Sequence, residues 1–193
     1  MEESTLNIKR KVILYIAQSL DGYIAKEDGD ISWLSIVERD NEDYGYQSFI
    51  ETVDTVIMGR KTYDKVLSFG VDFPHKDKKC YVISNTLKGS GDDVQYFSGN
   101  IEDLIISIRQ DEGKDIFVDG GAEVIRELKD KNLIDEYIIS IIPILLGKGI
   151  RLFKETDSES RLKLMECKVF DSGLVQLEYK RTEYATAASI VLQ

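Results

Sequence analysis

Apolar runs alternate with segments of helical periodicity along most of the chain. A long β-rich run covers 134–145, and two more runs, 162–170 and 174–181, flank Asp171-Ser172-Gly173. A turn signal between two such runs is typical of a hairpin. Five shorter runs rich in β-branched and aromatic residues predict buried strands at 12–17, 55–58, 80–83, 94–97 and 115–118.

The clearest helical face is formed by Tyr46, Phe49, Ile50 and Val53, whose spacing of i, i+3, i+4 and i+7 predicts a helix. Two further helices are expected around 104–108 and 124–128. Strand–helix alternation precedes the hairpin. This order predicts an α/β fold with about eight strands in a mostly parallel sheet, helices on both faces and an antiparallel C-terminal hairpin. Ligands of such sheets bind at the carboxyl ends of the strands.

The chain length of 193 residues fits one domain. We expect this domain to span 10–183, because 1–9 and 184–193 carry no strand or helix pattern and are interpreted as tails. No apolar run approaches the roughly 18 residues of a membrane helix, and the acidic N-terminus shows no signal peptide. Cys80 and Cys167 lie in apolar-rich runs without a pairing motif, which predicts buried free thiols in a reducing cytoplasm.

The charge balance excludes one class of partner. The chain has 25 Lys and Arg against 35 Asp and Glu, a formal charge of −10. A surface this acidic repels nucleic acid and anionic lipid. We therefore expect neither of them as a partner. The chain has one histidine, His75, which excludes a multi-histidine metal site, and we expect no metal.

Two junctions between a predicted strand and a helix start suggest phosphate binding. Gly59 is followed by Arg60, Lys61 and Thr62, and glycine, cations and a hydroxyl at a helix start attract anions. The alternative is a solvated turn. The second junction, 120–122, carries two glycines that would let a diphosphate approach backbone amides, although such a turn is more often only a tight helix start.

Asp43 is the most informative carboxylate. It precedes Tyr46 by three and Ile50 by seven, so we expect it on their apolar face, in the first turn of the helix. It would then be either a helix cap or a pocket carboxylate that bonds an aminopyrimidine edge and helps supply a proton. Trp33 is interpreted as a core residue or a ligand wall, and Asp21 as the start of a turn or mobile loop.

Taken together, these motifs resemble the dihydrofolate reductase superfamily, and within it the RibD C-terminal, riboflavin-pathway reductase branch. The resemblance covers about residues 10–181. The resemblance rests on residues 19–25, 58–63, 82–85, 119–122 and 133–149.

The resemblance implies NADPH as the cofactor. The residues it places at the cofactor are Ala17 and Gln18 at the nicotinamide, Gly59, Arg60, Lys61 and Thr62 at the phosphates, Ser84 and Asn85 at the 2′-phosphate, and Gly120, Gly121 and Ala122 at the diphosphate. Asp43 would be the catalytic acid, with Trp33 and Ser140 in the substrate pocket and 21–33 as a mobile loop. Lys78 falls nearest the arginine that binds the folate glutamate, and lysine lacks the bidentate fork.

The leading hypothesis is an NADPH-dependent reductase that transfers a hydride to a small heterocyclic substrate. The specific candidate is 5-amino-6-(5-phosphoribosylamino)uracil reduction in riboflavin biosynthesis. Dihydrofolate reduction and a non-catalytic NADP(H)-binding module are the alternatives. The resemblance also implies a homodimer, for which the apolar run 137–146 would be either an interface or core.

Overall fold

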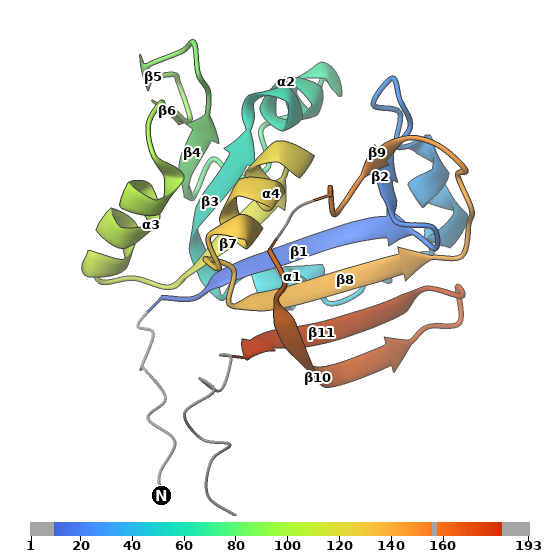
Figure 1. The fold of residues 1–193 in the computed structure, drawn as a ribbon. Helices are drawn as coiled ribbons and strands as arrows, with labels where there is room; N and C mark the ends of the chain where they lie inside the picture. Colours follow the sequence, from blue (N-terminus) through green and yellow to red (C-terminus); the bar gives the residue numbers. More distant parts are fainter. Residues whose placement is uncertain (1–9, 156–157, 183–193) are drawn as a thin grey trace, which may run out of the picture.

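The structure, a computed structural model, describes residues 10–155 and 158–182. Its strands are β1 (Val12–Ser19), β2 (Tyr23–Ala25), β3 (Val53–Gly59), β4 (Lys79–Ile83), β5 (Gly89–Ser90), β6 (Gln95–Phe97), β7 (Asp115–Gly120), β8 (Glu136–Ile142), β9 (Ile150–Arg151), β10 (Arg161–Val169) and β11 (Val175–Thr182). Nine of them form one sheet in the order β10-β11-β8-β1-β7-β3-β4-β6-β5 (Figure 1). The six strands from β8 to β6 are parallel, and β10, β11 and β5 pair antiparallel.

Helices cover both faces of this sheet. They are η1 (Ser32–Val37, a 3-10 helix), α1 (Tyr46–Ile50), α2 (Arg60–Ser68), α3 (Ile101–Gln110) and α4 (Ala122–Asp130). Alternate residues of each central strand point to opposite faces. On β1, Leu14 packs in the cluster that includes α3 and α4, whereas Ile13 packs in the cluster that includes Phe49 of α1 and Tyr63 of α2. The central strands are therefore apolar on both sides, which explains their continuous apolar runs.

The predicted α/β fold with its C-terminal hairpin is confirmed. Each of the eight predicted strand regions holds a strand of the sheet, and the ninth strand is the two-residue β5. The sequence pattern did not indicate β5, nor the separate two-stranded sheet of β2 and β9.

The first predicted helix is shorter than expected. It ends at Ile50, and Val53 begins β3. The backbone turns there because Thr52 donates to the Phe49 carbonyl, through its N–H at 2.9 Å and its hydroxyl at 2.7 Å. Val53 nevertheless joins the same apolar cluster as Phe49, so the spacing i+7 reflected a shared core and not a continuous helix.

Two further expectations concern the C-terminal part of the sheet. β8 lies between β1 and β11, which favours core over interface for residues 137–142 of the apolar run 137–146, whereas Leu145, beyond the strand, is 69% exposed. The expectation of two buried thiols holds for Cys80 and is wrong for Cys167. Cys167 is exposed because it lies on β10, the edge strand, whose nine residues are all exposed. Within the described residues no helix is long and apolar enough to cross a membrane.

Candidate active site

The strand order brings the two glycine junctions together. β7 and β3 are neighbours, and their register pairs Met58 with Gly120 at the carboxyl ends of both strands. Gly121 has φ = +89°, a conformation that favours glycine. A Cβ placed on Gly121 would lie 3.1 Å from Thr62 Oγ1 and 3.4 Å from Gly59 Cα. A side chain would crowd the start of α4 at Gly121, whereas a Cβ on Gly59 would make only ordinary contacts, the nearest at 3.4 Å from Val124 Cγ2.

Both helices start without a side-chain cap. The N-cap residues are Gly59 for α2 and Gly121 for α4, and neither accepts a hydrogen bond from its helix through a side chain. In α3, by contrast, Asn100 accepts from the Glu102 N–H at 3.0 Å. The free N–H groups and the positive ends of α2 and α4 thus lie side by side, the arrangement that binds a diphosphate.

The two cations at the start of α2 differ in their surroundings. Arg60 donates from Nε to both carboxylate oxygens of Asp64, at 2.7 and 2.8 Å, so part of its charge is neutralised. Lys61 is exposed and forms no ion pair within the described chain. Of the two, Lys61 offers the more available charge to an incoming phosphate.

Ser84 and Asn85 follow β4, beside β3 in the sheet. Ser84 is buried, and its Oγ accepts from the N–H groups of Leu87 at 3.0 Å and Thr86 at 3.3 Å. Asn85 is exposed. The Ser84 hydroxyl is thus already used in shaping the turn, and Asn85 is the freer group for a ligand.

A second group of predicted residues lines one cavity of about 310 Å³ at the carboxyl ends of β1 and β8. We call it the substrate cavity. Ala17, Asp43 and Ser140 all contribute to its lining. Ala17 and Ser140 are direct partners in the register of β1 and β8, and Gln18 is the next residue along, opposite Ile141. The structure therefore brings together residues that lie more than a hundred positions apart in the sequence.

Asp43 lies at the mouth of this cavity, but not as the helical pattern predicted. It is exposed and precedes α1, whose N-cap is Gly45. Its carboxylate accepts from the N–H groups of Gln47 and Gly45, each at 2.9 Å, and these hydrogen bonds lower the pKa of Asp43 below 3.8. The expected place on the apolar face is wrong, because the chain turns at Gly45 before the helix begins. Asp43 is both a capping residue and a cavity-lining carboxylate.

The floor of the substrate cavity is a polar network that the sequence did not indicate. Gln176 on β11 is 2% exposed, and its Nε2 donates to Tyr15 Oη at 3.0 Å, Ser140 Oγ at 3.2 Å and the Tyr44 carbonyl at 3.2 Å. Tyr15 Oη also donates to the Tyr44 carbonyl, at 2.9 Å. Burial raises the pKa of Tyr15, so its hydroxyl stays protonated. The network presents fixed, uncharged polar groups to a ligand.

Tyr44 is held in an unusual backbone conformation. Its φ is +57°, which costs a residue other than glycine about 1 kcal/mol or more. Its carbonyl accepts from both Tyr15 and Gln176, and its hydroxyl donates to the Val37 carbonyl. These bonds fix Tyr44 at the cavity wall, and such strain is common at functional sites.

Trp33 lies behind the cavity wall. It is buried in a cluster with Val37, Ile142 and Leu174, each of which lines the cavity. The structure thus places Trp33 in core, as one of the two interpretations expected. Its buried Nε1 has no hydrogen-bond partner among the described residues.

The segment 21–33, which is expected to be a mobile loop, contacts the connection that follows β8 at two places. Asp21 accepts from the N–H groups of Gly147 at 2.7 Å and Leu146 at 3.1 Å. Further along, β2 pairs with β9. The segment is therefore fastened at two places to the connection that follows β8.

A buried histidine contacts a half-buried aspartate next to the glycine pair. His75 is 2% exposed, and its Nε2 lies 3.2 Å from Oδ2 of Asp119, which directly precedes the glycine pair. Burial, followed by the charge of Asp119, raises the pKa of the cavity residue Tyr46 to about 12. Sequence reasoning missed this pair because 44 positions separate its members.

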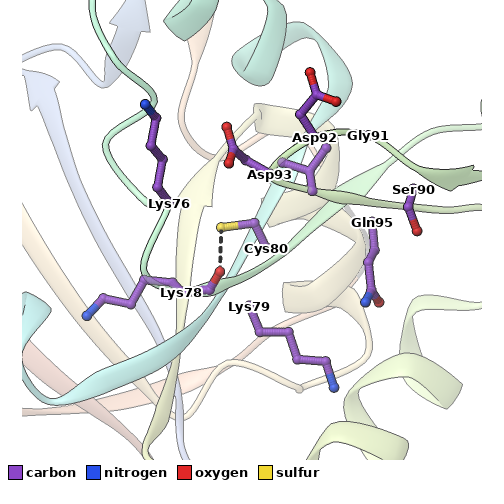
Figure 2. A pocket seen from close by; sticks show the side chains of 10 residues that line it. Lys76, Lys78, Lys79, Cys80, Ser90, Gly91, Asp92, Asp93 and Gln95 are labelled. Atoms are coloured by element: carbon purple, nitrogen blue, oxygen red, sulfur yellow. Dashed lines mark hydrogen bonds between the residues drawn. The ribbon is translucent and has the colours of Figure 1, made fainter.

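A cavity of about 290 Å³ lies at the other end of the sheet, around the start of β4 and β6. Figure 2 shows Lys76, Lys78 and Lys79 around it, with Cys80 at its centre. The cation predicted nearest the folate-binding arginine, Lys78, lines this cavity and pairs with Asp77 at 3.1 Å. Because ligands of parallel sheets bind at the carboxyl ends of the strands, the substrate cavity is the better candidate for chemistry.

The sheet order and the paired glycine junctions define an α/β fold of the dihydrofolate reductase type, with two uncapped helix starts and a cavity at the carboxyl ends of its strands. The family model of the RibD C-terminal domain matches residues 10–176, and the chain belongs to that family.

Comparisons with individual proteins agree with this assignment. The chain is 43% identical over 175 residues to YwjB of Bacillus subtilis (strain 168), a protein of uncharacterised function, covering 90% of this chain and 99% of YwjB. It is 37% identical to a solved candidate riboflavin biosynthesis protein of Shewanella sp. PV-4, with a TM-score of 0.83 and coverage of 90% and 99%. Dihydrofolate reductase of Enterococcus faecalis, solved with NADP(H), shares the fold at 17% identity, with a TM-score of 0.63 and coverage of 91% and 99%.

Proposed function

We propose that this protein is an NADPH-dependent reductase that transfers a hydride to a small heterocyclic substrate held in the substrate cavity. The observation that carries the proposal is the pair of uncapped helix starts at Gly59 and Gly121, which lie so close together that a Cβ on Gly121 would be 3.4 Å from Gly59 Cα. Free N–H groups beside Lys61 and Arg60 suit a phosphorylated dinucleotide. Family membership supports an oxidoreductase.

NADPH supplies the hydride when it is bound. The residues that would hold its phosphates are the backbone at 59–62 and 120–122, with Lys61 and Arg60 as cationic partners. Ala17 and Gln18, at the end of β1, lie between this edge and the substrate cavity and would position the nicotinamide through backbone groups.

Asp43 acts in this proposal as an ionised carboxylate. Its lowered pKa means that it holds no proton at neutral pH. It would accept a hydrogen bond from an amino or ring N–H of the substrate and orient the water that delivers the proton. Ser140 and Tyr15 would bind the other edge of the ring.

The competing hypotheses differ in measurable ways. The reductase proposal predicts that NADPH absorbance at 340 nm falls when the protein receives a reducible heterocycle, tested with dihydrofolate, dihydropteridines and 5-amino-6-(5-phosphoribosylamino)uracil. A non-catalytic NADP(H)-binding module would bind the cofactor and consume none of it with any member of the panel. That second result would overturn the proposed reaction.

The cytoplasmic location and the homodimer remain predictions. A second copy would find exposed apolar side chains on the edge strand β10, at Leu162, Leu164, Met165 and Val169. Light scattering during gel filtration distinguishes a dimer from a monomer.

A substitution at the glycine that starts α4 tests the proposed cofactor-binding edge. We call this edge, formed by residues 59–62 and 120–122, the cofactor edge. Gly121→Ala adds a methyl group at the crowded junction, 3.1 Å from Thr62 Oγ1, and we expect NADPH affinity to fall about tenfold or more. Gly70→Ala is the matched control, because Gly70 also has positive φ (+69°) but nothing within 4 Å of the added atom. Both variants should lose about 1 kcal/mol of folding stability. Equal NADPH affinity in the two variants would contradict the assignment.

A further inference from the structure

We infer that the substrate is a planar heterocycle that carries no phosphate group and is neutral or cationic. This inference rests on the proposed function and narrows it. It comes from the charged and hydrogen-bonding groups that surround the substrate cavity.

The mouth of the cavity is acidic. Glu38, Glu42 and Asp43 line it together with a single cation, Arg39, and all four residues are exposed. The Arg39 Nη1 donates to two carbonyl oxygens close by, those of Glu38 at 2.6 Å and Ile36 at 3.2 Å. An anionic ligand would therefore meet three carboxylates and one guanidinium whose Nη1 is already hydrogen-bonded to its own segment.

The backbone donors at this mouth are also occupied. The N–H groups of Gly45 and Gln47 both donate to Asp43, and the N–H of Tyr44 donates to Glu42 Oε1 at 2.8 Å. Free N–H groups at turns and helix starts are the usual protein ligands for phosphate where cations are few. Here Glu42 and Asp43 already accept from these three N–H groups, which are therefore not available to an anion.

No other cation compensates within the described lining of the cavity. Lys78, the nearest sequence counterpart of an anion-binding arginine, pairs with Asp77 and lines the separate cavity of Figure 2. The cations at Arg60 and Lys61 lie at the start of α2, on the cofactor edge. The acidic mouth and the cationic cofactor edge thus select opposite charges.

The interior suits a flat polar ring. Three tyrosines, Tyr15, Tyr44 and Tyr46, line the cavity and offer aromatic surface. Ser140, which lines the cavity and accepts from the buried Gln176, adds an uncharged hydrogen-bonding group. An amino group on the ring would face the ionised Asp43, which favours aminopyrimidine-like or pterin-like rings over phosphorylated ones.

The test compares ligands that differ only in the phosphate. Wild-type protein saturated with NADP⁺ is titrated by calorimetry with 5-amino-6-(5-phosphoribosylamino)uracil and its dephosphorylated counterpart, and with dihydroneopterin monophosphate and dihydroneopterin. In at least one pair, we expect the compound without phosphate to bind about tenfold more tightly, with the gap shrinking at high salt. The inference is overturned if neither pair shows this preference, whether because the phosphorylated member binds equally or more tightly or because no member binds.

Variants that remove the acidic charges test whether the mouth of the cavity causes the preference for ligands without phosphate. Glu38→Gln combined with Glu42→Gln keeps size and keeps the oxygen that accepts from Tyr44, and should reduce the preference severalfold. Glu51→Gln, at the far end of α1 and outside the cavity lining, should leave the preference unchanged. An unchanged preference in the double variant would count against the acidic mouth. NADP⁺ affinity, measured first in the same protein, separates this inference from the proposed function, because failure of the cofactor to bind overturns both.

Discussion

Asp43→Asn is expected to lower kcat by about a hundredfold, the usual scale for loss of a group that handles a proton. The amide keeps the size of the side chain but places an N–H donor where the carboxylate accepts. NADPH affinity should stay within about twofold of wild type, because Asp43 lies at the substrate cavity and not at the helix starts. Steady-state kinetics and cofactor titration on the same preparation measure both quantities.

The matched control for this variant is Asp40→Asn, which removes the same charge from an exposed neighbour outside the cavity lining. Because the pKa of Asp43 is lowered, its carboxylate is ionised throughout the range from pH 5 to 8 and adds no step to the pH profile there. The hydrogen bonds by which the Asp43 carboxylate caps α1 stabilise the fold above pH 3.8. This stabilisation is lost as the pH falls through the lowered pKa of Asp43. A kcat for Asp43→Asn within threefold of the control would rule out the assigned role.

Removing both cations at the start of α2 should produce the largest change in cofactor binding. Arg60→Ala combined with Lys61→Ala is expected to weaken NADPH binding by about ten- to a hundredfold, because each charge-assisted hydrogen bond contributes about 1.5–3 kcal/mol and Asp64 already neutralises part of Arg60. NADH, which lacks the 2′-phosphate, should lose less affinity. Fluorescence titration with both nucleotides gives the ratio.

Lys65→Ala provides the control, since Lys65 lies in the last turn of the same helix, away from its N-terminus. It changes the charge of α2 without changing the helix start. If Lys65→Ala weakens NADPH binding as much as the double variant does, general attraction to a basic helix explains the effect and the specific phosphate site is wrong.

The pattern of apolar runs was sufficient to predict the sheet, because strands buried on both faces read as continuous apolar segments. The glycine junctions could also be predicted, since each follows directly on such a segment. Boundaries were harder: Val53 shares a core with Phe49 across a turn, and spacing alone could not separate that arrangement from a longer helix.

The substrate cavity could be predicted only in part. Ser140 was identified from the resemblance, and Asp43 from helical spacing as well, but the position of Asp43 depends on the turn at Gly45, which helical spacing ignores. Gln176 and Tyr15 meet across 161 residues through the pairing of β11 with β8 and of β8 with β1. Pairing partners of distant strands leave no local signal, and neither does the contact of His75 with Asp119.

The central claim is that the paired helix starts at 59–62 and 120–122 bind a phosphorylated nicotinamide dinucleotide. Titration of the wild-type protein with NADPH and with NADH, followed by nicotinamide fluorescence, tests it most directly. Saturable binding of NADPH, tighter than that of NADH by about tenfold or more, is the predicted result. Absence of binding by either nucleotide would contradict the claim and, with it, the assignment of this protein as a reductase.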